Sequence, residues 1–317
     1  MGPDWANALG GDGMAADGAG FRRLLEETPV GIAVAQDGLL KFINAAGRAL
    51  FGWPVRELES RPLIELVDAG ERPRLIGIHR RWLRQGILPD HCELRAIGRE
   101  GDIRHWRVGM NPAEWQGRPA VLAAISDITE QVRVREEMRR MALHDVLTGL
   151  PNRLLLEDRI CQAIAAARRH GRGFAVIFLD LDGFKPINDS AGHRVGDHVL
   201  REIAGRLRAC TREMDTVARV GGDEFVVLLQ DVESRCECLP AARKLIEAAG
   251  SPVPYPGGVA RLGASAGLSF YPDDGDGLDS LMRVADESMY VAKRAGKNQV
   301  RCATCHHASG HGGPDCA

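Results

Sequence analysis

The sequence predicts an α/β (α+β) protein of two domains: an N-terminal domain with an antiparallel five-stranded sheet and helices, and a C-terminal α/β domain. A linker helix is expected between them. At 317 residues the chain is too long for one average domain. Short apolar runs separated by turns fill residues 21–129, whereas a continuous apolar run followed by acidic residues marks the second half. The stretch that separates the halves, 130–143, is highly charged.

Composition places the chain among ordinary globular proteins. Apolar residues make up 44%, and Lys plus Arg number 41 against 43 for Asp plus Glu, a balance that gives no reason to expect a nucleic-acid partner. Residues 1–20 lack the basic start and the apolar segment of a signal peptide and are predicted to form a flexible tail. Since no run of about 18 apolar residues occurs, we expect no membrane span and a cytoplasmic location.

The first half alternates strand-like runs with turns, and two helical patches interrupt it. The patches are 45–51 and 74–85, and they lie between the second and third runs. Strands are expected near residues 31–35, 39–43, 92–97, 103–108 and 121–125. Five short strands with helices in the middle predict a small α+β domain with one antiparallel sheet.

Residues 21–129 resemble a PAS sensor domain. The matching pieces are Thr28-Pro-Val-Gly-Ile32, Phe42-Ile-Asn44 ahead of Leu50-Phe-Gly-Trp53, and the closing Ser126-Asp-Ile-Thr-Glu130. PAS domains bind haem, flavin, small acids or nothing, so the resemblance leaves the ligand unknown. His79 lies one turn beyond the place where haem-binding relatives carry a histidine, and we expect it to be a surface or packing residue.

Residues 130–143 predict a helix between the domains. Apolar residues recur at roughly heptad spacing from Ile128 to Met141, which favours a short parallel coiled coil and a homodimer through the PAS domain and this helix. The alternative is a single solvated helix, because so few heptads do not establish a coiled coil.

The second half brings acidic residues to the ends of two predicted strands. The run 174–179 ends at Asp180, and a hairpin over 216–229 carries Asp223 and Glu224 at its glycine turn. Between them in the chain we expect a polar loop after Asp180 and then a helix with apolar residues on one stripe, Val199, Leu200, Ile203 and Leu207. This order of elements can place Asp180 beside Asp223, and paired carboxylates are typical ligands of Mg²⁺ in phosphoryl transfer.

Residues 144–301 resemble a GGDEF diguanylate cyclase domain. The matching motifs, in chain order, are Asp145-Val-Leu-Thr-Gly-Leu-Pro-Asn-Arg153, Asp180 to Asp189, Gly192-His193, Gly196-Asp197, Gly221 to Phe225, Ser265-Ala-Gly267 and Asp286 to Asn298. The resemblance implies a palm-like nucleotidyl cyclase fold that condenses two GTP into cyclic di-GMP (3′,5′) and two pyrophosphates. Each domain would hold one GTP, so a dimer is required. The alternative is a catalytically inactive GGDEF domain that acts as a GTP or cyclic di-GMP receptor.

The resemblance also implies roles for single residues. Two Mg²⁺ (or Mn²⁺) per half-site would be held by Asp180, the carbonyl of Leu181 and Asp223, and Asp223 would also help to deprotonate the 3′-hydroxyl. Catalytic roles are assigned to Asp223, Lys185 and Glu224. GTP would be bound by Asn188 and Asp197 at guanine, by His193, by the N–H groups near Gly183 and Phe184, and by Lys293 and Lys297, which we expect on one helical face. Relatives usually carry Arg at the position of Lys297.

Two further features flank these motifs. Arg212-Glu-Met-Asp215 ends six positions before Gly221, which is the placement of the family's RxxD product-inhibition site; an ordinary ion pair between Arg212 and Asp215 is the alternative. The C-terminal segment 302–317 is rich in Gly, Cys and His. Its residues Cys302, Cys305, His306, His307, His311 and Cys316 either bind a metal or belong to a disordered tail.

Overall fold

The computed structural model describes residues 18–303. The chain divides into two compact units, Met1–Glu137 and Met138–Ala317, and each is described on its own. Helix α5 (Thr129–Leu143) runs across the boundary between the units. None of the helices in the described range is long and apolar enough to cross a membrane.

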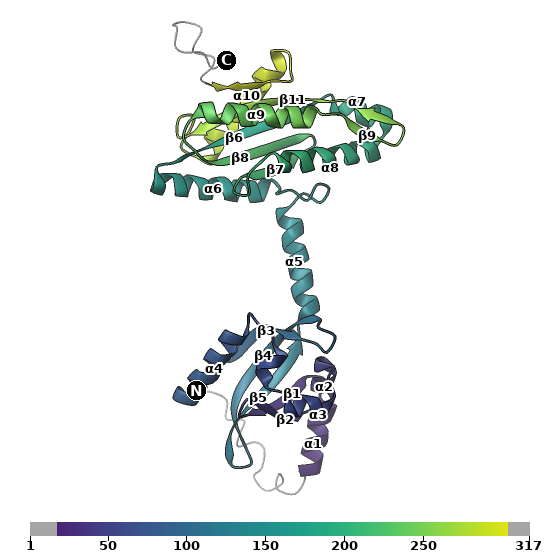
Figure 1. Cartoon of the computed structure of the whole chain (residues 1–317), viewed down its shortest axis with the longest axis vertical. Helices are drawn as coiled ribbons and strands as arrows, with labels where there is room; N and C mark the ends of the chain where they lie inside the picture. Colours follow the sequence, from purple (N-terminus) through teal and green to yellow (C-terminus); the bar gives the residue numbers. More distant parts are fainter. Residues whose placement is uncertain (1–17, 304–317) are drawn as a thin grey trace, which may run out of the picture. The chain divides into compact units, whose positions relative to one another are not determined.

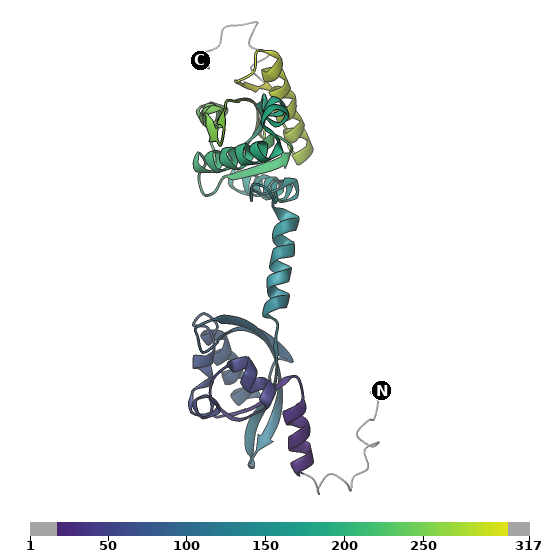
Figure 2. The ribbon, with the colours of Figure 1, turned by 90° about the vertical axis from the view of Figure 1, so that its right-hand side faces the viewer.

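The N-terminal unit is a five-stranded antiparallel sheet with helices packed around it (Figures 1 and 2), which confirms the predicted fold class of this half. The strand order is β2-β1-β5-β4-β3. Its elements are α1 (Gly18–Glu27), β1 (Gly31–Gln36), β2 (Leu39–Ile43), α2 (Ala45–Phe51), α3 (Val55–Ser60), η1 (Leu63–Leu66), α4 (Arg72–Gln85), β3 (His91–Ile97), β4 (Ile103–Trp115) and β5 (Arg118–Asp127). Helix α1 begins at Gly18, so the last residues of the predicted tail are helical.

Asn44 fixes the start of α2 against the sheet. Its Oδ1 accepts hydrogen bonds from the backbone N–H groups of Gly47 and Ile32, each at 2.8 Å. Its Nδ2 donates to the carbonyls of Leu25 and Val30 at 2.8 and 2.9 Å. A fully buried amide with all of these partners satisfied caps the helix and ties three segments of the chain together.

The C-terminal unit is a second five-stranded sheet, in the order β12-β11-β6-β8-β7, covered by helices on both faces (Figure 1). Its elements are α6 (Arg153–His170), β6 (Gly173–Asp182), α7 (Phe184–Ala191), α8 (His193–Ala209), β7 (Thr216–Gly221), β8 (Glu224–Val232), α9 (Arg235–Gly250), β9 (Val253–Tyr255), β10 (Gly258–Ala260), β11 (Gly263–Tyr271), α10 (Leu278–Arg294) and β12 (Val300–Cys302). Strands β9 and β10 form a separate two-stranded sheet.

Strand β6 is buried on both faces, which explains its unbroken apolar sequence. Successive side chains of a strand alternate between faces. Ile177, Leu179 and Leu181 pack in the core formed with α8 and α9, whereas Val176 and Phe178 pack in the core formed with α6 and α10. The strand therefore separates two apolar cores.

Two predictions about this half are wrong in detail. The segment after β6 was expected to be a polar loop, but Phe184–Ala191 form helix α7, because the buried Phe184 ring anchors its first turn. Cys302 was assigned to the tail, but it is the last residue of β12, pairs with Leu268 of β11 and is buried. The remaining Cys and His residues of the tail lie outside the described residues.

Candidate active site

Asp180 and Asp182 close the C-terminal end of β6 on the face that α10 covers. They continue the alternation of Val176 and Phe178, so their side chains leave the sheet on the α6 and α10 side. The register pairs Asp180 with Glu224 of β8, and Glu224 shares a face with Val226. Asp180 is buried at 8% exposure. Two carboxylates from adjacent strands thus meet at one rim of the sheet.

The glycine turn between β7 and β8 brings a third carboxylate to this rim. The turn consists of Gly222 and Asp223, and Gly222 has a φ of +36°, a left-handed conformation that favours glycine. The Leu181 N–H donates to the Asp223 carbonyl at 3.2 Å, which holds the turn beside the end of β6. The structure therefore brings together Asp180, Leu181, Asp223 and Glu224, as the sequence predicted.

The carboxylates concentrate negative charge. Burial raises the pKa of Asp180, and the charges of Asp223 and Asp182 add to this effect. Burial likewise raises the pKa of Glu224, with further contributions from Asp180 and Asp286. One cation opposes them: Lys293 Nζ on α10 lies 2.8 Å from Asp180 Oδ2. From the sequence, Lys293 was predicted only to bind the phosphates of GTP, and this ion pair was not predicted.

The donors at the rim fit a hard divalent cation. They are carboxylate oxygens with one nearby carbonyl oxygen. The negative charges of the carboxylates repel one another, and a bound cation would reduce this repulsion. Within residues 18–303, however, no group of three or more His, Cys, Asp or Glu side chains is arranged to hold a metal ion. In this arrangement the Lys293 ammonium partners Asp180.

Asp182 has a supporting position that sequence reasoning did not find. Its Oδ2 accepts from Ser265 Oγ at 2.8 Å and from the Asn298 N–H at 3.2 Å. These bonds tie the end of β6 to β11 and to the segment after α10. The motifs that contain Ser265 and Asn298 were visible in the sequence, but their link to Asp182 depends on the fold.

The predicted GTP-binding residues of α7 and α8 occupy one corner of the unit. Gly183 precedes α7 with a φ of +86°, and an added Cβ there would meet only open space. The Asn188 amide packs directly on Gly196, the residue before Asp197, where a side chain at Gly196 would collide with Asn188 Oδ1. Lys185 and His193 are exposed. The corner therefore presents polar groups from two helices to solvent.

Lys297 does not share a helical face with Lys293, contrary to the prediction. Helix α10 ends at Arg294, because Gly296 and Lys297 take positive φ angles of 115° and 63°. The Lys297 N–H donates to the Ala292 carbonyl at 3.1 Å and closes the helix end. Lys297 is an exposed residue of this turn.

Arg212 and Asp215 lie before β7, at the margin of a cavity that Arg159 and Arg208 also line. The Asp215 carboxylate accepts from the backbone N–H groups of Arg212 and Gln230 at 2.9 and 3.1 Å. In the described part of the chain, the hydrogen-bond partners of the Asp215 carboxylate are thus backbone groups and not the Arg212 guanidinium. The Asp215 side chain thus shapes the backbone, and Arg212 is exposed.

A charged contact connects the beginning of this unit to the glycine turn. Arg219 Nη1 donates to both oxygens of Asp145, at 3.0 and 3.1 Å, and Arg219 Nε and Nη2 donate to the Gly222 carbonyl at 2.9 and 2.7 Å. Thr148 also donates to Asp145 through its N–H and its hydroxyl. The residue that precedes Asp223 is therefore held by a chain of contacts that starts just after α5.

Replacing Asp145 by alanine is expected to lower the free energy of unfolding of the C-terminal unit by about 1–3 kcal/mol at neutral pH. Burial alone would raise the pKa of Asp145, but the hydrogen bonds from Thr148 and Arg219 outweigh it and lower that pKa. Because the pKa of Asp145 is lower in the folded than in the unfolded state, its ionised form stabilises the folded state at pH values above the unfolded-state pKa. This contribution to stability is lost as the pH falls through the lowered, folded-state pKa.

Urea unfolding followed by the three tyrosines, Tyr255, Tyr271 and Tyr290, would measure this effect, since all of them lie in the C-terminal unit. The difference between wild type and Asp145→Ala should shrink in acid. Asp158→Ala is the matched control, because Asp158 is an exposed partner of Gln162 on α6. Equal destabilisation by both substitutions would contradict the anchoring role.

Two family models match the chain. The model described as "Diguanylate cyclase, GGDEF domain" matches residues 142–299, and the model described as "PAS fold" matches residues 25–133.

Curated proteins match over the same region. A bifunctional diguanylate cyclase/cyclic di-GMP phosphodiesterase of Pseudomonas aeruginosa, MucR, is 46% identical over 183 residues, which are 58% of this chain and 26% of that protein. The diguanylate cyclase TpbB of Pseudomonas aeruginosa is 40% identical over 177 residues, 55% of this chain and 41% of that protein. An uncharacterized signaling protein of Caulobacter vibrioides is 35% identical over 285 residues, 89% of this chain and 34% of that protein. The chain thus spans less than half the length of these relatives.

Solved structures resemble the second half of the chain. The crystal structure of the GGDEF domain of TpbB is 41% identical and covers 49% of this chain and 96% of its own, with a TM-score of 0.48. The coiled coil and GGDEF domain of DgcB from Caulobacter crescentus, in complex with c-di-GMP, is 29% identical and covers 55% of this chain and 93% of its own, with a TM-score of 0.50.

Proposed function

Because the chain belongs to the GGDEF diguanylate cyclase family and carries a PAS domain ahead of its GGDEF domain, we propose that it condenses two GTP into cyclic di-GMP and two pyrophosphates. The observation that carries this proposal is the convergence of Asp180, Asp223 and Glu224 at one rim of the sheet, with Lys293 against Asp180. The Gly221–Phe225 motif is intact. Relatives named diguanylate cyclases support the same reaction.

The chain's own groups have distinct tasks in this reaction. Each GTP 3′-hydroxyl attacks the α-phosphate of the other GTP, so two phosphodiester bonds form, two α–β phosphoanhydride bonds break, and two pyrophosphates leave. Asp223 takes the hydroxyl proton. Lys185, Lys293 and Lys297 balance charge on the phosphates, and the N–H groups at the start of α7 face phosphate beside the open space at Gly183.

Mg²⁺ or Mn²⁺, when bound by Asp180, the Leu181 carbonyl and Asp223, supplies further positive charge beside the phosphates. The several carboxylates at the rim support the binding of two such ions per half-site. Their binding is part of the proposal.

Guanine specificity comes from the corner of α7 and α8. A carboxylate such as Asp197 accepts from both N1–H and the exocyclic amine of guanine, and adenine lacks this pair of donors. The Asn188 amide lies against Gly196, the residue that precedes Asp197 in the chain, which supports a shared role for the two side chains. Because buried polar groups left without partners are costly, GTP should be preferred to ATP by about 10⁴-fold.

The reaction requires two facing GGDEF domains, since each holds one GTP. Helix α5 supports association of two chains, because Met138 and Met141 are 61% and 53% exposed on its surface. The PAS domain and α5 would regulate synthesis by setting the orientation of the two half-sites.

The full chain, incubated with GTP and Mg²⁺, tests the proposal when cyclic di-GMP and pyrophosphate are quantified by chromatography. Two pyrophosphates per cyclic di-GMP are expected. A chain that binds GTP but forms no cyclic di-GMP in any oligomeric state would instead be a receptor for GTP or cyclic di-GMP.

Product inhibition is proposed to act through Arg212 and Asp215. The neighbouring Arg159 and Arg208 favour an anion at this place, and the related DgcB structure contains c-di-GMP. Arg212→Ala should raise the inhibition constant for added cyclic di-GMP by about tenfold or more. The constant is obtained from the rates of the reaction with and without added product. Arg283→Ala, an exposed arginine of α10 paired with Glu287, is the control. An unchanged inhibition constant in Arg212→Ala would rule out this site.

A further inference from the structure

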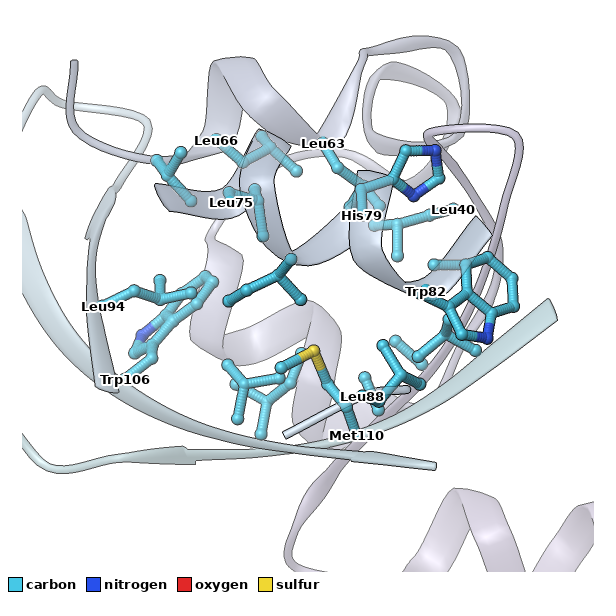
Figure 3. Close-up of a pocket in the computed structure, with 18 of the residues that line it drawn as sticks. Leu40, Leu63, Leu66, Leu75, His79, Trp82, Leu88, Leu94, Trp106 and Met110 are labelled. Atoms are coloured by element: carbon cyan, nitrogen blue, oxygen red, sulfur yellow. The ribbon is translucent and has the colours of Figure 1, made fainter. Parts of the chain in front are cut away.

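The PAS domain contains an apolar cavity of about 140 Å³ between its sheet and helix α4 (Figure 3). Met110 and Trp106 of β4 line it from the sheet side, and Leu75, Ile78 and Trp82 line it from α4. None of the described residues around it carries a carboxylate, an ammonium, a guanidinium or a hydroxyl group in its side chain. Apart from the His79 imidazole and the indole N–H groups of Trp82 and Trp106, the lining is therefore apolar.

The volume limits what the cavity accepts. An engineered protein cavity of about 150 Å³ lined by Leu, Ile and Phe stays dry and binds benzene or xenon. Sites for drug-sized ligands measure about 300–1,000 Å³. Haem and flavin, with several times as many atoms as benzene, exceed the space available here.

The lining also excludes charged ligands. A carboxylate transferred into this cavity would lose its water without gaining a cationic partner, which is strongly unfavourable. His79, the titratable side chain in the lining, is exposed, lies at the margin of the cavity, and has its ring 5.9 Å from that of Trp82. It was expected to be a surface or packing residue, and its position agrees with that expectation.

Helix α4 is only partly packed on the side of the cavity, where Ile78 contacts the apolar core. None of its residues is buried, although Leu75, Ile78 and Trp82 form one apolar stripe at spacings of three and four residues. A void forfeits the dispersion contacts of the side chains around it. A ligand that filled the space would supply those contacts and hold α4 more firmly on the sheet.

We propose that this cavity binds a small, uncharged, hydrocarbon-rich molecule of about the size of toluene. Binding rests on the cavity alone and is independent of the cyclase reaction. It would couple the presence of such a molecule to the order of α4.

The full chain offers two reporters for this proposal. All five tryptophans lie within residues 1–116, so thermal unfolding followed by tryptophan fluorescence reports the N-terminal unit. The Met110 methyl group, labelled with ¹³C, lies at the cavity, and the Met289 methyl group in the C-terminal core is an internal control.

Toluene should shift the Met110 signal, leave that of Met289 in place, and raise the unfolding midpoint by at least about 3 °C near saturation. Amide exchange in α4 should slow. Benzoate, which carries a carboxylate on the same ring, should neither shift the Met110 signal nor raise the unfolding midpoint at equal concentration. Binding of benzoate as tight as that of toluene, or an unperturbed Met110 signal with both compounds, would overturn the proposal.

Filling the cavity provides the matched variant. Ala123→Leu places extra carbons in the cavity from β5, whereas Ala124→Leu makes the same change on the opposite, exposed face of the strand. Toluene binding should be lost in the first variant and kept in the second. Ala35→Leu on β1 fills the same cavity and replaces Ala123→Leu if that variant does not fold. Retained binding in a folded cavity-filling variant would contradict the assignment.

Discussion

Asp223→Asn is expected to lower the rate of cyclic di-GMP formation by about 10³-fold or more. The substitution keeps the size of the side chain and the glycine turn, but it removes the charge that we assign to metal binding and the basic oxygen that we assign to the 3′-hydroxyl. The turn itself should persist, because the Asp223 backbone carbonyl, and not its side chain, accepts from Leu181.

The measurement is the initial rate of product formation, together with GTP binding by calorimetry. Asp231→Asn is the matched control: Asp231 lies on β8, the strand that follows the Asp223 turn, is exposed, and has a φ of +56°, which asparagine tolerates. A variant Asp223→Asn that folds and retains more than a tenth of the wild-type rate would remove Asp223 from the catalytic role. A loss of rate in the control as well would point to disruption of β8 instead.

The second large effect is on stability, at Gly267. Strand β11 faces α10 with small residues, and a Cβ at Gly267 would collide with the backbone of Ala285 and Met289. Backbone atoms of a packed helix do not move aside at low cost, so Gly267→Ala should lower the free energy of unfolding by about 3 kcal/mol or more. Because α10 also carries Lys293, displacement of the helix should weaken the contact with Asp180 and reduce activity.

Gly205→Ala is the control for this substitution. Gly205 is exposed within α8, and an added Cβ would meet nothing within 4 Å. Alanine there should raise the free energy of unfolding by about 0.5–1 kcal/mol, since glycine is the poorer helix former. Unfolding followed by the tyrosines, which all lie in the C-terminal unit, would compare the two variants. Equal stability of both would show that α10 adjusts freely over β11.

Local sequence patterns predicted the parts of the site that lie on regular strands. The apolar run before Asp180 and the Gly221-Gly222 turn each have a short-range signature, and strand pairing then brings Asp180 opposite Glu224. The five strands of the PAS domain were predictable for the same reason, since period-two patterns bounded by turns are local.

The rest depends on contacts between distant segments. The Lys293–Asp180 pair joins residues more than a hundred positions apart, and the Arg219–Asp145 pair spans 74. Helix α7 was missed because Pro, Asn, Asp and Ser favour turns and loops, and the burial of Phe184 and packing on α8 hold the segment helical. The end of α10 before Lys297 was a local signal that we misjudged, since Gly296 is a typical residue for ending a helix.

The alternation of faces along β6 has a consequence for changes in chain length. Because successive side chains of β6 alternate between its faces, Ile177 and Leu179 point toward α8 and α9, whereas Asp180 points toward α10. Deleting a single residue between Phe174 and Asp180 would exchange the two faces, sending the acidic side chain into one apolar core and opening voids in both. Insertions and deletions should therefore be absent from β6 in any functional variant, whereas the exposed turn 256–257 between β9 and β10 can change length without shifting a buried side chain.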